Sequence, residues 1–176
     1  TGDSLKACYD NEGYFCLNNM HIGYSVDPIY DLRFVNAILC SKLMNFYYHA
    51  ISLEFGRAMA QIDIETLDQL PLPKVFTKQN KSNNEKIDFS IYINDLLQDQ
   101  QSEQIESTID RLLASIGNEN YHDFLSFIVQ ELLIIARQNP SKFDEVKFSV
   151  LDHVIDMVVY RLYALSNDEV QFIEDF

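Results

Sequence analysis

Two short motifs in the sequence resemble parts of catalytic sites. The first, Asp27-Pro28-Ile29-Tyr30, is one residue away from the Asp-Pro-Pro-Tyr turn that holds the exocyclic amine of a flipped base. That chemistry also needs a glycine-rich loop for a nucleoside cofactor, and the five glycines of the chain form no GxG pattern. We therefore interpret residues 27–30 as a turn that leads into a helix, with Pro28 near the helix start.

The second motif is the Glu145-Val146-Lys147 triplet, which matches the E-x-K half of a nuclease metal site. Such a site needs a second carboxylate on a neighbouring strand, whereas this triplet falls on a predicted helix and is typical of a solvated face. The histidines show no HxxxH spacing, and the chain has no GxSxG motif or Walker loop. We therefore predict no catalytic residue, no metal site and no cofactor site within this chain.

The remaining candidate is a polar and aromatic surface on residues 33–61. It carries side chains that can read purine edges, hold phosphates or stack on bases. The predicted DNA-contacting residues are Lys42, Asn45, Tyr48, His49, Arg57 and Gln61. Arg57 and Lys42 are the strongest candidates for phosphate or guanine. The signal is weak by itself, because a helix whose aromatic residues only build the core would carry similar residues.

The charge of the chain is divided unevenly. The net charge of −14 argues against a nucleic-acid binder when the chain is taken as a whole. Residues 1–81 hold 7 basic and 9 acidic side chains, a net of −2, and residues 82–176 hold 6 and 18, a net of −12. We therefore expect any phosphate contact to come from the first part.

Three scattered cysteines (Cys8, Cys16 and Cys40) without a CxxC pair favour buried thiols in a reducing cytoplasm over a disulfide framework. No apolar run reaches the roughly 18 residues of a membrane span, and we find no signal peptide. The chain also begins without an initiator methionine, which suggests a fragment of a longer protein.

The periodicity predicts an α+β fold. Residues 13–26 favour a strand, an Asn-Asn turn and a second strand, and residues 31–50 favour one long helix capped by Asp31. We expect residues 1–80 to form the strand-containing part. We expect residues 81–176 to form an acidic helical part, in which residues 101–138 make a hairpin beside the core. Its last helix, at about 142–165, would pack back on the first part. Gly117 with Asn118 should end one helix, and Ser141 with Asp144 and Ser166 with Glu169 resemble capping boxes that begin two others.

Three motifs carry a resemblance to a known family. Residues 39–48 read LCSKLMNFYY, residues 69–73 read QLPLP, and residues 154–174 read VIDMVVYRLYALSNDEVQFIE. In this order they resemble the TaqI-like C-terminal specificity domain of adenine-specific DNA methyltransferases and single-chain type IIG restriction-modification enzymes. The sequence departs from the family pattern at Cys40, where asparagine is usual, at Ala164, where glycine is usual, and at Arg161, where an acidic residue is common.

The resemblance implies a target recognition domain that reads double-stranded DNA sequence specifically. Methyl transfer would then belong to an N-terminal methyltransferase domain of the same polypeptide. That domain would use S-adenosylmethionine, and Mg²⁺ would serve a fused nuclease. The alternative is a non-catalytic helical protein-interaction module, in which the acidic helices form the contact surface.

Overall fold

The computed structural model describes residues 4–17, 20–27, 29–53, 61–74, 87–98, 102–138 and 143–176. These residues form eight α-helices and one short 3-10 helix. The helices are α1 (Leu32–Cys40), α2 (Lys42–Ile51), α3 (Ile64–Leu67), α4 (Phe89–Gln98), α5 (Ser102–Ile116), η1 (Asn118–Asn120), α6 (Tyr121–Ala136), α7 (Glu145–Leu162) and α8 (Asn167–Glu174).

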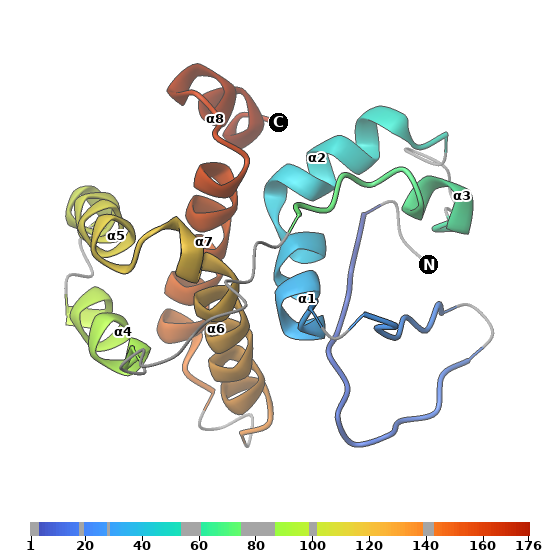
Figure 1. Ribbon diagram of the computed structural model, residues 1–176, viewed down its shortest axis with the longest axis horizontal. Coiled ribbons are helices and arrows are strands. Elements are labelled where there is room, and N and C mark those ends of the chain that lie inside the picture. The colour runs from blue at the N-terminus through green and yellow to red at the C-terminus, as the bar shows by residue number, and fades with distance from the viewer. Residues whose placement is uncertain are drawn as a thin grey trace.

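The predicted α+β class is wrong for the part of the chain that the structure describes, because no strand is present there. Residues 14–17 and 20–26 run as an irregular trace in Figure 1, with bends at Met20 and Val26, and they pair with no neighbouring strand. The Asn-Asn pair expected to turn between them lies outside the described residues. A strand is defined by its hydrogen-bonded partner, and this segment lies at the periphery, away from the helical core.

The single helix predicted over residues 31–50 is two helices that meet at Ser41. This residue has extended backbone angles, φ −66° and ψ 152°, and so ends α1 and begins α2. The Ser41 side chain accepts a hydrogen bond from the N–H of Met44 and donates one of 2.7 Å to the Ile38 carbonyl. A buried serine that caps one helix while bonding the end of the previous one therefore interrupts the apolar stripe.

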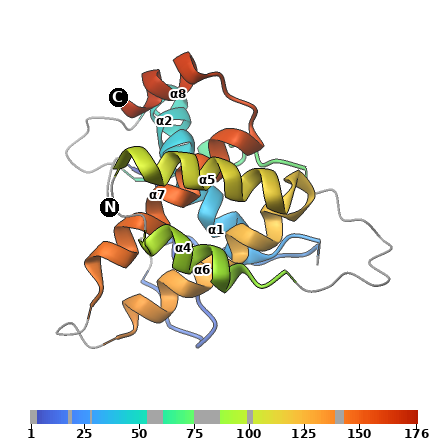
Figure 2. The same ribbon diagram turned by 90° about the vertical axis from the view of Figure 1, so that its left-hand side faces the viewer.

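Helices α6 and α7 occupy the centre of the molecule. Figures 1 and 2 show α1 to α3 on one side of this pair and α4 and α5 on the other. Helix α6 packs against α1 as well as α7, and α7 also contacts α2, α4 and α5. Residues 101–138 are therefore not a hairpin standing beside the core, because α6 belongs to the core itself. The apolar stripe of α6, which includes Phe124, Ile128 and Ile135, is buried there.

The predicted helix ends in the second half are largely confirmed. Helix α5 ends before Gly117, whose φ of +72° suits glycine, and Ser166 with Glu169 forms the predicted capping box of α8. Asp144 rather than Ser141 is the N-cap of α7, and it accepts a 2.9 Å hydrogen bond from the N–H of Lys147. Among the described residues, no helix is long and apolar enough to cross a membrane.

Candidate nucleic-acid interface

Lys42 begins α2 and is surrounded by carboxylates. Its ammonium forms an ion pair with Glu174 of α8, and its main-chain N–H donates a 2.8 Å hydrogen bond to Oδ1 of Asp156 on α7. The second carboxylate oxygen of Glu174 accepts a 2.7 Å hydrogen bond from the Tyr160 hydroxyl. The Lys42 side chain is 51% exposed, so it remains reachable from solvent while paired.

The ionisation of this cluster follows from its contacts. Burial raises the pKa of Asp156 to about 6, and the hydrogen bond from Lys42 opposes this only in part. Burial also opposes ionisation of Glu174. The Lys42 and Tyr160 hydrogen bonds outweigh that effect and lower the pKa of Glu174. The hydrogen bond to Glu174 in turn raises the pKa of Lys42. Lys42 therefore carries a full positive charge that is largely balanced within the chain.

The other predicted residues of α2 are turned toward the rest of the protein. Asn45 accepts a 2.8 Å hydrogen bond from the N–H of Leu5 and thereby holds the N-terminal segment against the helix. Tyr48 is completely buried. The His49 ring packs against Phe176 at a centroid distance of 5.5 Å. These three residues hold α2 against neighbouring segments, so the structure does not bring them together on one exposed face.

The other two predicted residues follow α2 in the sequence. Gln61 is exposed, just before the short helix α3. Arg57 lies outside the described residues, as do Lys78 and Lys81. Of the cations in the first part that the structure describes, Arg33 is ion-paired with Asp31. Lys6 and Lys74 are exposed. The cations with which this part would meet phosphate are therefore these two lysines together with Arg57, Lys78 and Lys81.

Two long-range contacts that no sequence pattern predicted connect residues 61–74, which include α3, to other segments of the chain. His21 Nε2 lies 2.6 Å from the carbonyl oxygen of Ile62, and the Tyr163 hydroxyl of α7 donates to the carbonyl of Pro71. These contacts place residues 61–74 between the N-terminal segment and the end of α7. No local pattern predicts them, because each joins residues far apart in the sequence.

The two catalytic motifs are used structurally. The carbonyl of Asp27 accepts a hydrogen bond from the N–H of Tyr30, which makes the predicted turn before α1. Lys147 of the E-x-K triplet forms a 3.0 Å ion pair with Glu131 of α6. No group of three or more histidine, cysteine, aspartate or glutamate side chains in the described residues could hold a metal ion.

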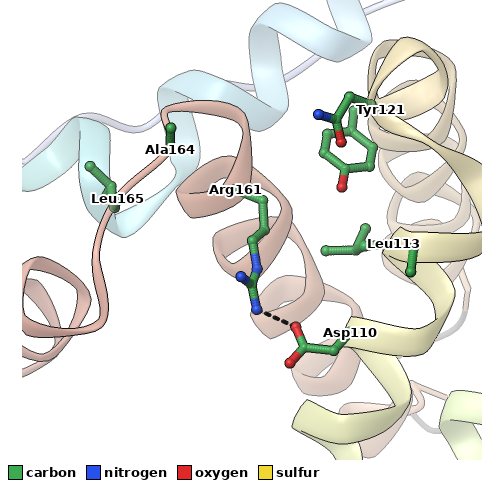
Figure 3. A pocket seen from close by; sticks show the side chains of 8 residues that line it. Asp110, Leu113, Tyr121, Arg161, Ala164 and Leu165 are labelled. Carbon is green, nitrogen blue, oxygen red and sulfur yellow. Dashed lines mark hydrogen bonds and ion pairs between the residues drawn. The ribbon is translucent and has the colours of Figure 1, made fainter.

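A shallow hollow of about 570 Å³ lies between α5, α6 and the end of α7 (Figure 3). An ion pair between Arg161 and Asp110 crosses it, and Tyr121 and Leu113 line its wall. Both charged groups of the hollow thus already have a partner, and its other polar side chains are the uncharged Asn118 and Tyr121.

Comparison with known proteins finds a similarity for the first part of the chain. Residues 1–72 match the family model of the TaqI-like C-terminal specificity domain, which confirms the resemblance seen at residues 39–48 and in the segment that reaches Leu72. Domains of this family confer DNA sequence specificity in restriction-modification systems. The resemblance at residues 154–174 lies outside the match and stays a prediction. No curated protein and no solved structure was found to match the chain.

Proposed function

We propose that this chain recognises double-stranded DNA sequence specifically, as the target recognition domain of an adenine-specific DNA methyltransferase. The enzyme could act alone or fused to an endonuclease, as in type IIG restriction-modification enzymes. The observation that carries this proposal is the family match of residues 1–72. The matched residues include α1, α2 and α3, which lie together on one side of the molecule (Figure 1).

The distribution of charge also favours DNA contact through the side of the molecule that carries α1, α2 and α3. Helices α4 and α5, which together carry four acidic side chains and one basic side chain, lie on the opposite side of the α6–α7 pair, where they would stay far from DNA phosphates (Figures 1 and 2). Residues 1–81 have a net charge of −2 against −12 for residues 82–176, and four of their seven basic residues flank α3 in the sequence: Arg57, Lys74, Lys78 and Lys81. Phosphate contacts from these cations would place the domain on the duplex, and neighbouring polar side chains would read base edges.

The methyl donor would be held by another domain of the enzyme. The five glycines of this chain form no glycine-rich loop, so its residues do not fit S-adenosylmethionine. We therefore derive no chemical step within this chain, and we assign it recognition alone. The methyltransferase domain of the same polypeptide would be its partner.

The proposal is tested by selection from a random duplex library with the full chain, followed by fluorescence anisotropy with the enriched sequence. We expect an enriched motif and a preference over scrambled duplex. Arg57→Ala should weaken binding by about 1–3 kcal/mol if Arg57 makes a bidentate guanine contact. Arg111→Ala removes the same charge from α5 and is the matched control. Binding without sequence preference, or equal effects of the two variants, would contradict the proposal.

A further inference from the structure

The thiol of Cys40 lies against a segment from the beginning of the chain. Cys40 is the last residue of α1, and its sulfur donates a 3.4 Å hydrogen bond to the carbonyl oxygen of Ala7. Ala7 directly precedes Cys8, so the next residue along that segment carries a second thiol. Both cysteines are free and lie at the surface. The contact therefore brings together two thiols that are distant in the sequence.

The dimensions of the peptide unit limit the distance between these two cysteines. In a trans peptide, the carbonyl oxygen is about 3 Å from the Cα atom of the following residue. The sulfur of Cys40 therefore lies within about 6 Å of the Cα atom of Cys8. Two cysteines that form a disulfide have Cα atoms about 4.4–6.8 Å apart, so a small adjustment of the chain around Cys8 would allow the bond.

The segment that carries Cys8 is anchored on both sides of this residue. Before it, the N–H of Leu5 donates a 2.8 Å hydrogen bond to Asn45 of α2. After it, Arg137, which follows α6, donates a 2.7 Å hydrogen bond to Asn11. Residues 5–10 between these anchors form no helix or strand, which leaves their backbone free to make the adjustment. The anchors hold the two thiols near each other and so raise the effective concentration of one at the other.

We propose that Cys8 and Cys40 form a reversible disulfide that fastens the beginning of the chain to the end of α1. The bond would enclose residues 8–40, which include all of α1, and would stabilise their folded arrangement by restricting the unfolded chain. Transient disulfides of this kind commonly serve in redox sensing. This inference is independent of the proposed DNA recognition.

The reaction is a thiol–disulfide exchange with a low-molecular-weight disulfide, for which oxidised glutathione is the probe. The Cys8 thiolate attacks one sulfur of the probe, which forms a mixed disulfide and releases one glutathione thiolate. The Cys40 thiolate then attacks the sulfur of Cys8, and the second glutathione thiolate leaves. The two leaving groups take up the two protons that the cysteines lose. One oxidised glutathione thus yields one protein disulfide and two molecules of reduced glutathione.

The surroundings of Cys40 assign it the second of these two steps. Burial of the sulfur raises the pKa of the Cys40 thiol, and the end of a helix also disfavours a negative charge. Cys40 is therefore poorly suited to attack a disulfide from solution. A small fraction of thiolate is enough once the mixed disulfide on Cys8 has formed beside it, because the second attack takes place within the chain.

The test adds oxidised glutathione to the reduced full chain and maps the disulfides by mass spectrometry of peptides cut without reduction. We expect the peptide pair joined through Cys8 and Cys40 to exceed any pair that contains Cys16 by about tenfold or more. Oxidation should also raise the melting temperature by about 5 °C or more, and dithiothreitol should reverse this rise.

Cys40→Ser keeps a hydroxyl that can donate to the Ala7 carbonyl but cannot complete the exchange. It should leave Cys8 as a mixed disulfide with glutathione and should show no rise in melting temperature. Cys16→Ser removes the third free cysteine and is the matched control, which should keep both the cross-link and the rise. Before oxidation, both variants should melt close to the parent chain.

Three results would overturn the proposal. The first is a mixed disulfide on Cys8 that persists in the parent chain, because it would show that Cys40 does not reach it. The second is a cross-link that preferentially uses Cys16 or joins two chains. The third is a Cys8–Cys40 bond that lowers the melting temperature or leaves it unchanged, because the folded state would then not accommodate the disulfide.

Discussion

The main-chain N–H of Lys42 donates its hydrogen bond to the side chain of Asp156, 114 residues later in the sequence. A carboxylate of α7 thereby caps the first turn of α2, where the helix dipole favours a negative charge. Asp156 is only 4% exposed, so this contact is made in the core of the protein. It joins the first helices of the chain to the helix that carries most of the C-terminal core.

The first prediction concerns the pH dependence of this contact. The pKa of Asp156 is about 6 in the folded chain against 3.8 for the ordinary group. The folded state therefore binds the proton more tightly, and the Asp156 contribution to stability rises as pH falls from above 6 to below 4. Asp156→Asn keeps an oxygen that can accept from Lys42. It should raise the free energy of unfolding at pH 8 by up to about 3 kcal/mol, with little effect at pH 4.

Urea unfolding from pH 4 to pH 8 measures this difference. Asp152→Asn is the matched control, because it removes the same charge from an exposed site one turn earlier on α7. Its effect should be smaller at every pH. If the Asp156→Asn variant and the parent chain show parallel pH profiles, the proton responsible for the pH dependence is bound elsewhere.

The second prediction concerns the end of α7. Ala164 has a φ of +55°, the left-handed conformation that glycine adopts without strain. The N–H of Leu165 bonds to the carbonyl of Tyr160, as in a helix end that requires this conformation. Ala164→Gly should therefore raise the free energy of unfolding by about 1 kcal/mol.

Ala114→Gly is the matched control, because Ala114 is exposed within α5 and glycine there should lower stability by about 1 kcal/mol. Chemical denaturation of the two variants gives both values. Destabilisation by Ala164→Gly similar to that of Ala114→Gly would show that the backbone at Ala164 is not strained. The departure from the family pattern at this position would then have no energetic cost.

The local features of the fold could be predicted from the sequence. Asp31, Ser166 with Glu169, and Gly117 mark helix ends through contacts with their own neighbours, and all of them act as predicted. Ser41 was missed because the apolar spacing continues across it. Only its burial and its bonds to Ile38 and Met44 reveal the interruption.

The long-range features could not be predicted in this way. The alternation in residues 14–26 predicts a strand, but a strand also needs a partner, and the described chain provides none. The predicted DNA-contacting residues were chosen by side-chain type, and type does not distinguish an exposed tyrosine from the buried Tyr48. Asn45 likewise has the chemistry to read a base, yet it bonds to Leu5.

The third prediction tests whether Lys42 contacts DNA. Glu174→Gln should release the Lys42 ammonium from its ion pair, since the neutral amide holds it less strongly. If Lys42 meets phosphate, affinity for duplex DNA should rise several-fold, and the log–log salt slope should steepen by about one. Asp175→Asn removes the same charge from the next residue, and anisotropy titrations at several salt concentrations compare the two. Equal effects of the variants would assign the change to net charge alone and exclude Lys42 as a phosphate ligand.

The last prediction concerns the dependence of the first part on the C-terminal helices. Helix α7 packs against α1 and α2, buries Val154 and Val158, and supplies the Asp156 cap of α2. A chain ending at residue 138 would keep α6 but would leave apolar surfaces of α1, α2 and α6 in water, at about 25 cal/mol per Å². It should therefore lack a cooperative thermal transition. A chain ending at residue 165 lacks only α8, whose one buried side chain among the described residues is Ile173, and it should still melt cooperatively at a somewhat lower temperature. Circular dichroism and calorimetry of the two chains test this contrast, and cooperative melting of the shorter chain would show that residues 1–80 fold without α7.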